Sequence, residues 1–206
     1  MNPTSRFIDN FRRGKLCVHP TDTQLGLTCD LSVHAARTRL ALFKQRDTAD
    51  GYVHLASDFA TAQKYWLKLP SIWGEILADV YPAPLTVIWR AVDANMHGTQ
   101  SGRLAIRVPD LRGSWFEECL QSLQLIPSTS VNHAGATPMT AQKVWDSALR
   151  LDSGFYIPAL QLLTATENEH RPSTIIALED SGEYRVLRSG SLDDAVIRKY
   201  QVHASI

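Results

Sequence analysis

Short apolar runs, each flanked by proline, alternate along this chain with longer stretches of helical spacing. Three such runs, with their flanking prolines, are residues 16–18 with Pro20, residues 85–89 with Pro84, and residues 104–108 with Pro109. Apolar or β-branched runs of this length are typical of strands and are too short for stable helices. The chain is therefore constrained to build a β-sheet and to cover it with helices.

The order of these elements decides the class of sheet. Strands are predicted over residues 16–18, 52–56, 85–89, 104–108, 126–132, 173–177 and 184–187. Helices are predicted over residues 5–13, 35–44, 59–69, 71–81, 115–123, 141–149 and 192–200. Because the two do not alternate as a regular βαβ series, the pattern indicates an α/β (α+β) fold. We expect a twisted mixed sheet surrounded by helices, not a doubly wound parallel sheet.

Several of the predicted helices carry signals at their ends. Gly14 is expected to end the first helix, because glycine readily adopts the left-handed conformation that follows a helix. Asp30 or Ser32 is expected to cap the second helix, and Asp58 the third. Asp110 is expected to cap the fifth. In each case a side-chain oxygen would accept a free backbone N–H group of the first turn.

The composition indicates how many domains the chain can form and in which cellular compartment it is expected. The 206 residues, 44% of them hydrophobic, suffice for one core, and no Ser/Gly/Pro-rich stretch divides them, so a single domain over residues 1–206 is expected. Lys plus Arg equals Asp plus Glu at 21 each, which disfavours a broad basic coat but allows a local basic pocket. Neither a signal peptide nor a membrane-spanning stretch is recognisable. The three cysteines fit no metal or disulfide pattern, so a cytoplasmic protein is expected.

Five polar clusters lie at ends of the predicted strands and helices, where loops gather side chains into one cleft. They are Pro20-Thr21-Asp22-Thr23 within a turn-rich PTDTQLGL segment, Lys44-Gln45-Arg46, Arg103 with Arg107, Ser128 to Asn132, and Ser173-Thr174 with Arg188. This mixture of cations, hydroxyls and amides suits an anionic ligand such as a nucleotide. Each cluster is explained equally well by local structure. Threonine and aspartate side chains can stabilise a turn, cations are favoured at the C-terminus of a helix, and serine and threonine hydroxyls can bond the backbone groups of a loop. The residues alone predict an α/β domain with a candidate anion site and no more.

Motifs of other chemistries are missing from the sequence. It contains no GxxxxGK[ST], no GxGxxG after a strand, no HExxH and no GxSxG. The seven histidines show no ligand spacing, and no pair of catalytic carboxylates is evident. No metal held by protein ligands is therefore predicted.

Taken in order, the clusters resemble the YrdC/TsaC family of threonylcarbamoyl-AMP synthases. The matching stretches are KLCVHPTDTQLGLTCD, FKQRDTADGYVHLAS, YPAPLTVIW, RLAIRVPD, IPSTSVNHAG, RPSTII and YRVLRSGSL, which span about residues 15–190. No single motif is decisive, but the ordered series is specific. The resemblance implies a sheet with a large, positively charged concave pocket, in the short bacterial form of the family.

The resemblance also implies a reaction and roles within it. The carbamate formed from threonine and bicarbonate would attack the α-phosphate of ATP and expel pyrophosphate, with Mg²⁺ accompanying ATP. The product, threonylcarbamoyl-AMP, would serve the N6-threonylcarbamoyladenosine modification of tRNA, with the threonylcarbamoyl-transfer proteins as partners. The implied threonine-binding residues are Thr23, Arg107, Ser128 and Ser173. The implied nucleotide-binding residues are Lys44, Arg46, Arg103, Ser130, Asn132 and Arg188, with Lys44 and Arg46 also catalytic.

Two alternatives stay open at this point. The fold could serve as a module that binds double-stranded RNA or tRNA, although a net charge of zero disfavours it. The other is a divergent paralogue with lost or changed activity, because Asp47 and Asp50 stand where the family usually has proline and lysine or asparagine. Ala83 and Val131 are further departures, standing where the family usually has glycine and alanine.

Overall fold

The computed structural model describes residues 2–47, 51–133, 135–164, 171–193 and 195–197. The strands are β1 (Leu16–His19), β2 (Gly26–Thr28), β3 (Val53–Ala56), β4 (Leu85–Arg90), β5 (Arg103–Arg107), β6 (Leu125–Ser130), β7 (Phe155–Tyr156), β8 (Thr174–Leu178) and β9 (Tyr184–Arg188). The helices are α1 (Pro3–Arg12), α2 (His34–Lys44), α3 (Phe59–Tyr65), α4 (Ser71–Val80), α5 (Trp115–Leu123), α6 (Ala141–Asp146) and α7 (Leu160–Thr164), with a 3-10 turn at Ala148–Leu151.

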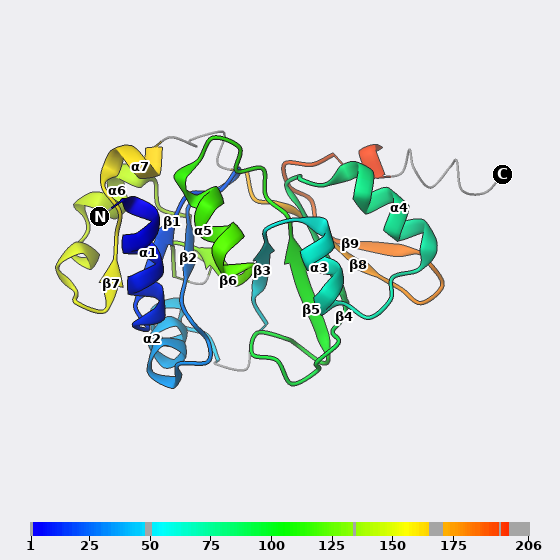
Figure 1. Ribbon diagram of the computed structural model, residues 1–206, viewed down its shortest axis with the longest axis horizontal. Helices are drawn as coiled ribbons and strands as arrows, with labels where there is room; N and C mark the ends of the chain where they lie inside the picture. The colour runs from blue at the N-terminus through cyan, green and yellow to red at the C-terminus, as the bar shows by residue number, and fades with distance from the viewer. Residues whose placement is uncertain (1, 48–50, 134, 165–170, 194, 198–206) are drawn as a thin grey trace.

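One mixed sheet forms the centre of the fold (Figure 1). Within the described residues, its nine strands lie in the order β7-β1-β2-β6-β3-β5-β4-β8-β9. The pairs β1–β7, β3–β5 and β4–β8 are parallel. The remaining five pairs are antiparallel. The predicted fold class, a mixed sheet surrounded by helices, is therefore confirmed.

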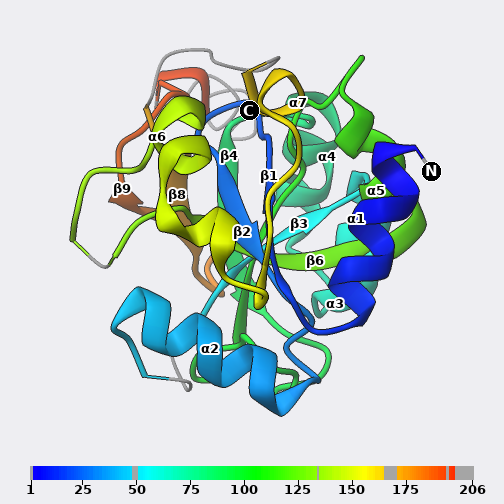
Figure 2. The same cartoon turned by 90° about the vertical axis from the view of Figure 1, so that its left-hand side faces the viewer.

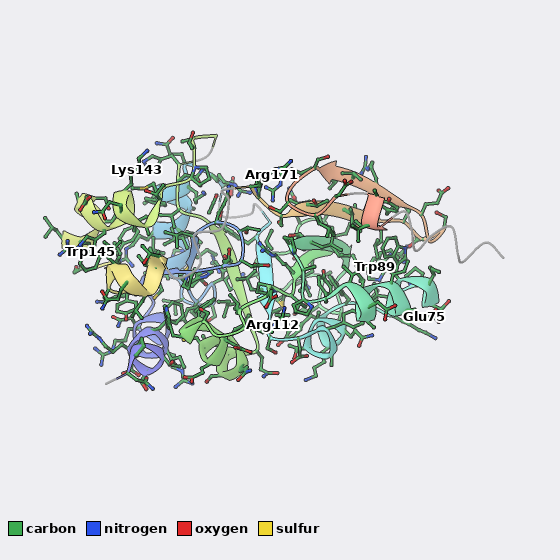
Figure 3. All side chains as sticks on the ribbon, turned by 90° about the horizontal axis from the view of Figure 1, so that it is seen from above. Glu75, Trp89, Arg112, Lys143, Trp145 and Arg171 are labelled. Carbon is green, nitrogen blue, oxygen red and sulfur yellow. The ribbon has the colours of Figure 1, made fainter. Side chains whose placement is uncertain are left out.

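The helices cover the two faces of the sheet unequally. Seen from above, α1, α5, α3 and α4 lie along one side, whereas Lys143 of α6 and Arg171 lie on the other (Figure 3). α2 lies below the strands in the view of Figure 2 and packs on β1. No helix among the described residues has both the length and the apolar character needed to cross a bilayer.

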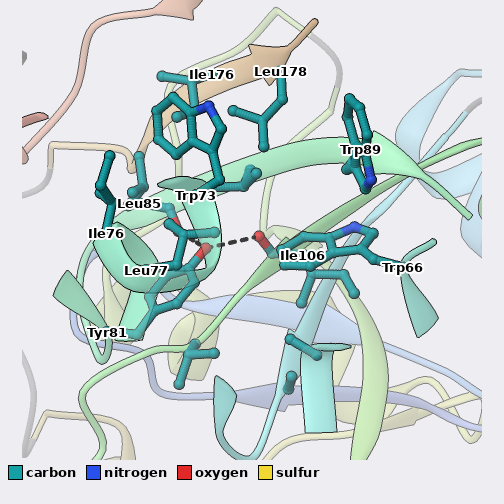
Figure 4. Packing of buried hydrophobic residues seen from close by; sticks show 14 of the residues in the cluster. Trp66, Trp73, Ile76, Leu77, Tyr81, Leu85, Trp89, Ile106, Ile176 and Leu178 are labelled. Carbon is teal, nitrogen blue, oxygen red and sulfur yellow. Dashed lines mark hydrogen bonds between the residues drawn. The ribbon is translucent and has the colours of Figure 1, made fainter. Parts of the chain in front are cut away.

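Hydrophobic cores on both sides of the sheet fix these positions. Phe7 of α1 and Phe116 of α5 pack with Ile126 of β6 in one core. Trp73 of α4 and Ile106 of β5 belong to a second, in which the Tyr81 hydroxyl lies 3.2 Å from the Leu85 carbonyl oxygen and 3.3 Å from that of Ile106 (Figure 4). A third core joins α2 and α6 to β1 and β2. Burial of this apolar surface is the main term that holds the layers together.

Alternation along β5 separates the core from a polar face. Leu104 and Ile106 are fully buried in the core beneath α3 and α4. Because successive side chains of a strand point to opposite faces, Arg103, Ala105 and Arg107 lie on the other face of the sheet. The α4 side of β5 thus supplies packing, and its opposite side supplies charge.

Two strands were not predicted from the sequence. β2 begins in the last two residues of the PTDTQLGL segment, which is polar and turn-rich by composition, and ends one residue beyond it, at Thr28. β7 has two residues and, within the described part of the chain, pairs with β1 alone. Strands this short are stabilised by the neighbours they pair with, so they leave almost no periodic signal.

Several predicted helix ends were wrong. Asp58 does cap α3, accepting from the Thr61 N–H group at 2.6 Å. The N-cap of α5, however, is Ser114, and the N-cap of α2 is Val33, which makes no side-chain cap bond. Asp110 binds Arg112 instead. The predicted helices over 59–69 and 141–149 end earlier, where the structure has α3 and α6, and of the helix over 192–200 only 195–197 are helical in the described part.

Candidate functional site

A cavity of 680 Å³ opens on the polar face of the sheet. Its walls come from the β1–β2 loop, the end of α2, and strands β3 to β6, β8 and β9 with their flanking residues. Five cationic residues line it, namely Lys44, Arg46, Arg103, Arg107 and Arg188, and no acidic residue is among the described lining residues. A chain without net charge therefore concentrates positive charge in one concave site, which suits an anionic ligand.

The register of the sheet explains why residues distant in sequence meet here. Arg107 lies opposite Thr86, Thr86 opposite Ile175, and Ile175 opposite Arg188. Directly opposed residues of paired strands share one face of the sheet. A cross-strand row thus carries two arginines, 81 positions apart by their numbers, to the same cavity.

Lys44 ties the end of α2 to the end of β6. Its Nζ atom donates to the Ser130 carbonyl oxygen at 2.9 Å and to Asn132 Oδ1 at 2.8 Å, and the residue is 3% exposed. α2 ends in a left-handed residue, Gln45, after which Arg46 also lines the cavity. Burial, reinforced by the neighbouring Arg46 charge, lowers the pKa of Lys44 to about 8. Lys44 is thus still mainly protonated at neutral pH.

Arg107 is held by the β1–β2 loop. Its Nη1 atom donates to Thr23 Oγ1 at 2.8 Å, and its Nη2 atom forms an ion pair with Asp22. The other Asp22 oxygen accepts from the Asp110 N–H group at 3.1 Å. Burial raises the pKa of Asp22 more than the Arg107 charge lowers it, and burial likewise lowers the pKa of Arg107. This nearly buried pair fixes the guanidinium against the cavity wall.

Ser173 and Arg188 form a second polar group in the cavity lining. The Arg188 guanidinium donates to the Ser173 carbonyl oxygen at 2.9 Å and to Ser173 Oγ at 3.1 Å. Ser173 Oγ also lies 2.9 Å from Thr86 Oγ1. Arg103 lies further along β5 and donates to the Leu178 carbonyl oxygen at 3.1 Å. The cationic residues are therefore held in place by protein acceptors and are pre-arranged for a ligand.

Ser128, which lines the cavity, is backed by a buried histidine that does not line it. The His19 Nε2 atom lies 3.1 Å from Ser128 Oγ, and the ring stacks on Phe116 with centroids 4.3 Å apart. His19 pairs with Gly26 across β1 and β2. A Cβ atom on Gly26 would lie 2.2 Å from His19 Cε1 and 2.8 Å from Ser128 Oγ. Only glycine leaves room for this ring.

Gly26→Ala is therefore expected to lower the free energy of unfolding by about 1–3 kcal/mol, as overpacking of a close-packed core does. The His19 ring cannot move aside easily, because Phe116 stacks on it and Phe7 meets it edge-on. Urea unfolding of the variant and the wild type measures the difference.

Gly74→Ala supplies the matched control for this substitution. Gly74 lies inside α4, and a Cβ atom there would meet nothing within 4 Å. Alanine is favoured over glycine within a helix, so this variant is expected to be more stable by about 0.5–1 kcal/mol. Equal stability changes in the two variants would contradict the close approach at Gly26.

Comparisons with known proteins agree with this geometry. The Sua5/YciO/YrdC family model, described as telomere recombination, matches residues 9–190. The chain belongs to this family. A threonylcarbamoyl-AMP synthase of Chromohalobacter salexigens is 32% identical over 177 residues, which is 84% of this chain and 90% of that relative.

Solved structures of Sua5/YciO/YrdC proteins share the fold. P. abyssi Sua5, complexed with L-threonine, superposes with a TM-score of 0.78 at 22% identity over 96% of this chain, which spans only 56% of that protein. E. coli YciO superposes with a TM-score of 0.72 at 18% identity, over 94% of this chain and 91% of its own. The predicted family resemblance is therefore confirmed.

In this family member, the ten predicted site residues all line the cavity. They are Thr23, Lys44, Arg46, Arg103, Arg107, Ser128, Ser130, Asn132, Ser173 and Arg188. Their shared location is a finding, whereas the roles assigned to them stay predictions. Two residues of the site had no predicted role: Asp22, expected only to shape a turn, and His19. Since 109 positions separate His19 from Ser128, no local pattern in the sequence links them.

The departures from the family pattern lie mostly away from the cavity. Asp47 is exposed and does not line it, and Asp50 lies outside the described residues. Val131 is fully buried in the core formed by α2 and α6. Ala83 is not among the described residues with positive φ, so no glycine is required there. No described group of three or more His, Cys, Asp or Glu residues is arranged to hold a metal ion.

Proposed function

We propose that this protein is an L-threonylcarbamoyladenylate synthase, which converts L-threonine, bicarbonate and ATP into threonylcarbamoyl-AMP and pyrophosphate. The observation that carries the proposal is the single cavity in which all ten predicted residues meet, with five cations and no carboxylate among its described lining. Family membership and the name of the C. salexigens relative support it. The threonine bound to P. abyssi Sua5 agrees with the proposed amino-acid substrate.

The cavity suits a reaction in which positioning and charge do the catalysis. The carbamate oxygen of threonine attacks the α-phosphorus of ATP, and the bond to the bridging oxygen breaks as pyrophosphate leaves. Lys44 and Arg46 neutralise the charge that develops on the phosphates. Preorganised cations of this kind need no reorganisation during the step, and no pair of acid–base carboxylates is required.

Mg²⁺ enters this scheme with ATP, as part of the substrate. The described cavity lining offers hydroxyl and carbonyl oxygens but no carboxylate. Mg²⁺ is often bound through phosphate oxygens and water with few protein ligands, so this lining is compatible with it. When bound, the ion would neutralise charge on the leaving group.

The product defines the partners. Threonylcarbamoyl-AMP is a mixed anhydride, so the proteins that transfer its threonylcarbamoyl group to tRNA are the partners we propose. We also expect action in the cytoplasm, where the described buried cysteines would stay reduced. Direct binding of tRNA or double-stranded RNA is not favoured, because the chain has no excess of cations for phosphate contacts.

Pyrophosphate release tests the proposed function directly. ATP is supplied with threonine and bicarbonate, added separately and together, and an active family member serves as the positive control. Release that requires both co-substrates supports the synthase. If the control releases pyrophosphate and this protein does not, the proposed synthase function is replaced by the divergent paralogue or the RNA-binding module. Titrations with ATP and with RNA at several salt concentrations then separate those two.

The affinity for ATP is expected to fall as pH rises through about 8. The cause is Lys44, whose lowered pKa of about 8 means that its ammonium loses its charge in the unliganded protein between about pH 7 and pH 9. Calorimetric titration with a non-hydrolysable ATP analogue measures the trend. In Lys44→Arg the guanidinium stays charged throughout, so the trend should flatten. An equal fall in both proteins would contradict this origin.

A further inference from the structure

The protonation of His19 is fixed by its two partners. Its Nδ1 atom lies 3.0 Å from the Pro20 carbonyl oxygen, which can only accept, so Nδ1 carries the proton. A neutral imidazole has one N–H group, which leaves Nε2 as an acceptor. The ring is neutral at physiological pH, because burial lowers the pKa of His19 to about 4. Across the 3.1 Å contact, Ser128 must therefore donate its hydroxyl proton to His19.

The same reasoning fixes the hydroxyl of Thr23. Thr21 Oγ1 donates to the Gln24 carbonyl oxygen at 2.6 Å, which uses its only proton. In the 3.2 Å contact between the two threonines, Thr23 is thus the donor. Thr23 also accepts from Arg107 at 2.8 Å. Because both hydroxyl protons are used within the protein, the hydroxyl oxygens of Thr23 and Ser128 can accept a hydrogen bond from a ligand but cannot donate one.

Several other polar side chains that line the cavity cannot accept a further hydrogen bond. Its five cations only donate, and Asn132 Oδ1 already accepts from Lys44 and from the Ser130 hydroxyl. An amino acid bound here brings donors of its own, an amine and, for threonine, a hydroxyl. Those groups need acceptors, since a buried donor without a partner costs about 1–3 kcal/mol.

We infer that His19 is a positioning residue: it turns the Ser128 proton away from the cavity, so that Ser128 presents an acceptor to the amine or hydroxyl of the amino-acid substrate. His19 itself does not touch the cavity contents, because it is fully buried and does not line the cavity. The inference rests on the proposed function, since it deepens the description of the same site. Its specific consequence is that His19 governs threonine affinity and leaves ATP affinity alone.

A matched pair of substitutions tests this role. His19→Asn retains a donor for the Pro20 carbonyl oxygen but is too short to reach Ser128, whereas the longer amide of His19→Gln can still accept the Ser128 proton. In His19→Asn and in Ser128→Ala, the KM for threonine is expected to rise about tenfold, with the KM for ATP changed by less than about twofold. His19→Gln should stay close to the wild type. The double variant His19→Asn/Ser128→Ala should be no worse than Ser128→Ala alone.

His54 provides the control for loss of a buried histidine. It is 3% exposed and its Nδ1 atom binds the Tyr52 carbonyl oxygen at 3.1 Å, but it does not line the cavity. His54→Asn should therefore lower the melting temperature without changing the KM for threonine. If His19→Asn does not fold, His19→Phe is tested in its place. A phenyl ring fills the space between Phe7 and Phe116 and offers no acceptor to Ser128.

Three results would overturn the role of His19. The first is a folded His19→Asn or His19→Phe protein with the wild-type KM for threonine, and the second is a KM for ATP that rises in parallel. The third is a double variant whose rise in the KM for threonine is the product of the two single rises. Calorimetric titration with L-threonine gives the same comparison without turnover. If the wild type binds threonine but releases no pyrophosphate, the proposed function fails while His19 is still judged by binding. If the wild type does not bind threonine, both fail.

Discussion

Replacement of Arg107 by alanine is expected to lower the free energy of unfolding by about 3–5 kcal/mol at neutral pH, because it leaves a buried carboxylate without its partner. The side chains of Arg107 and Asp22 are 6% and 13% exposed. After the substitution, the Asp22 carboxylate keeps backbone N–H partners, among them that of Asp110, but has no cationic partner among its described contacts. Threonine binding should be lost with the guanidinium, and chemical denaturation measures the stability.

The pH dependence of this loss identifies its cause. Burial already raises the pKa of Asp22, and without the opposing Arg107 charge the pKa rises further. A carboxyl group whose folded-state pKa is raised stabilises the fold at low pH and loses that contribution as pH rises through the folded-state value. The deficit of Arg107→Ala relative to wild type should therefore shrink as the pH falls from neutral through the raised pKa of Asp22. A deficit independent of pH would contradict the stranded carboxylate.

Two further variants isolate the buried pair. Adding Asp22→Asn to Arg107→Ala removes the stranded charge, so part of the stability should return and the pH dependence should vanish. Arg90→Ala breaks a surface ion pair with Asp180, whose side chains are 48% and 61% exposed. Exposed pairs contribute about 0–1 kcal/mol, so this control should change little.

The sequence predicts the parts of the fold that rest on local patterns. The apolar runs at β4 and β5 are long enough to be read as strands, and the irregular order of the elements indicates a mixed sheet. The ten site residues were found through an ordered series of motifs, and the fold does bring them to one cavity. Local sequence patterns are therefore enough to predict both the class of fold and the cationic residues of the site.

What the sequence misses depends on contacts between distant segments. β2 has three residues and is a strand because β1 and β6 pair on either side of it. Asp22 was expected to shape a turn, yet it binds Arg107, 85 positions away. His19 and Ser128 are likewise joined only through the register of β1, β2 and β6. Neighbours set by sheet register have no counterpart in local sequence spacing.

Lys44→Met is expected to lower kcat/KM for ATP by about 10²–10³-fold, the loss seen when one preorganised donor is removed from a transition-state site. Methionine keeps an unbranched apolar stem in place of the buried Lys44 side chain, so the fold should survive. Part of the loss should appear in kcat, because the proposed role of the ammonium is to neutralise charge that grows as pyrophosphate departs. Steady-state kinetics of pyrophosphate release measures both constants.

The proposed catalytic role of Lys44 is separable from its structural one. Its Nζ atom also holds Ser130 and Asn132, so a merely structural lysine would change the melting temperature and the KM for ATP without changing kcat. Lys143→Ala, on the exposed surface of α6, controls for loss of a positive charge and should leave all three quantities unchanged. A Lys44→Met enzyme with wild-type kcat and only a raised KM would show that Lys44 binds ATP equally well in the ground state and the transition state. Catalysis would then rest on Arg46 and on the Mg²⁺ that we propose accompanies ATP, and Lys44 would be a binding residue alone.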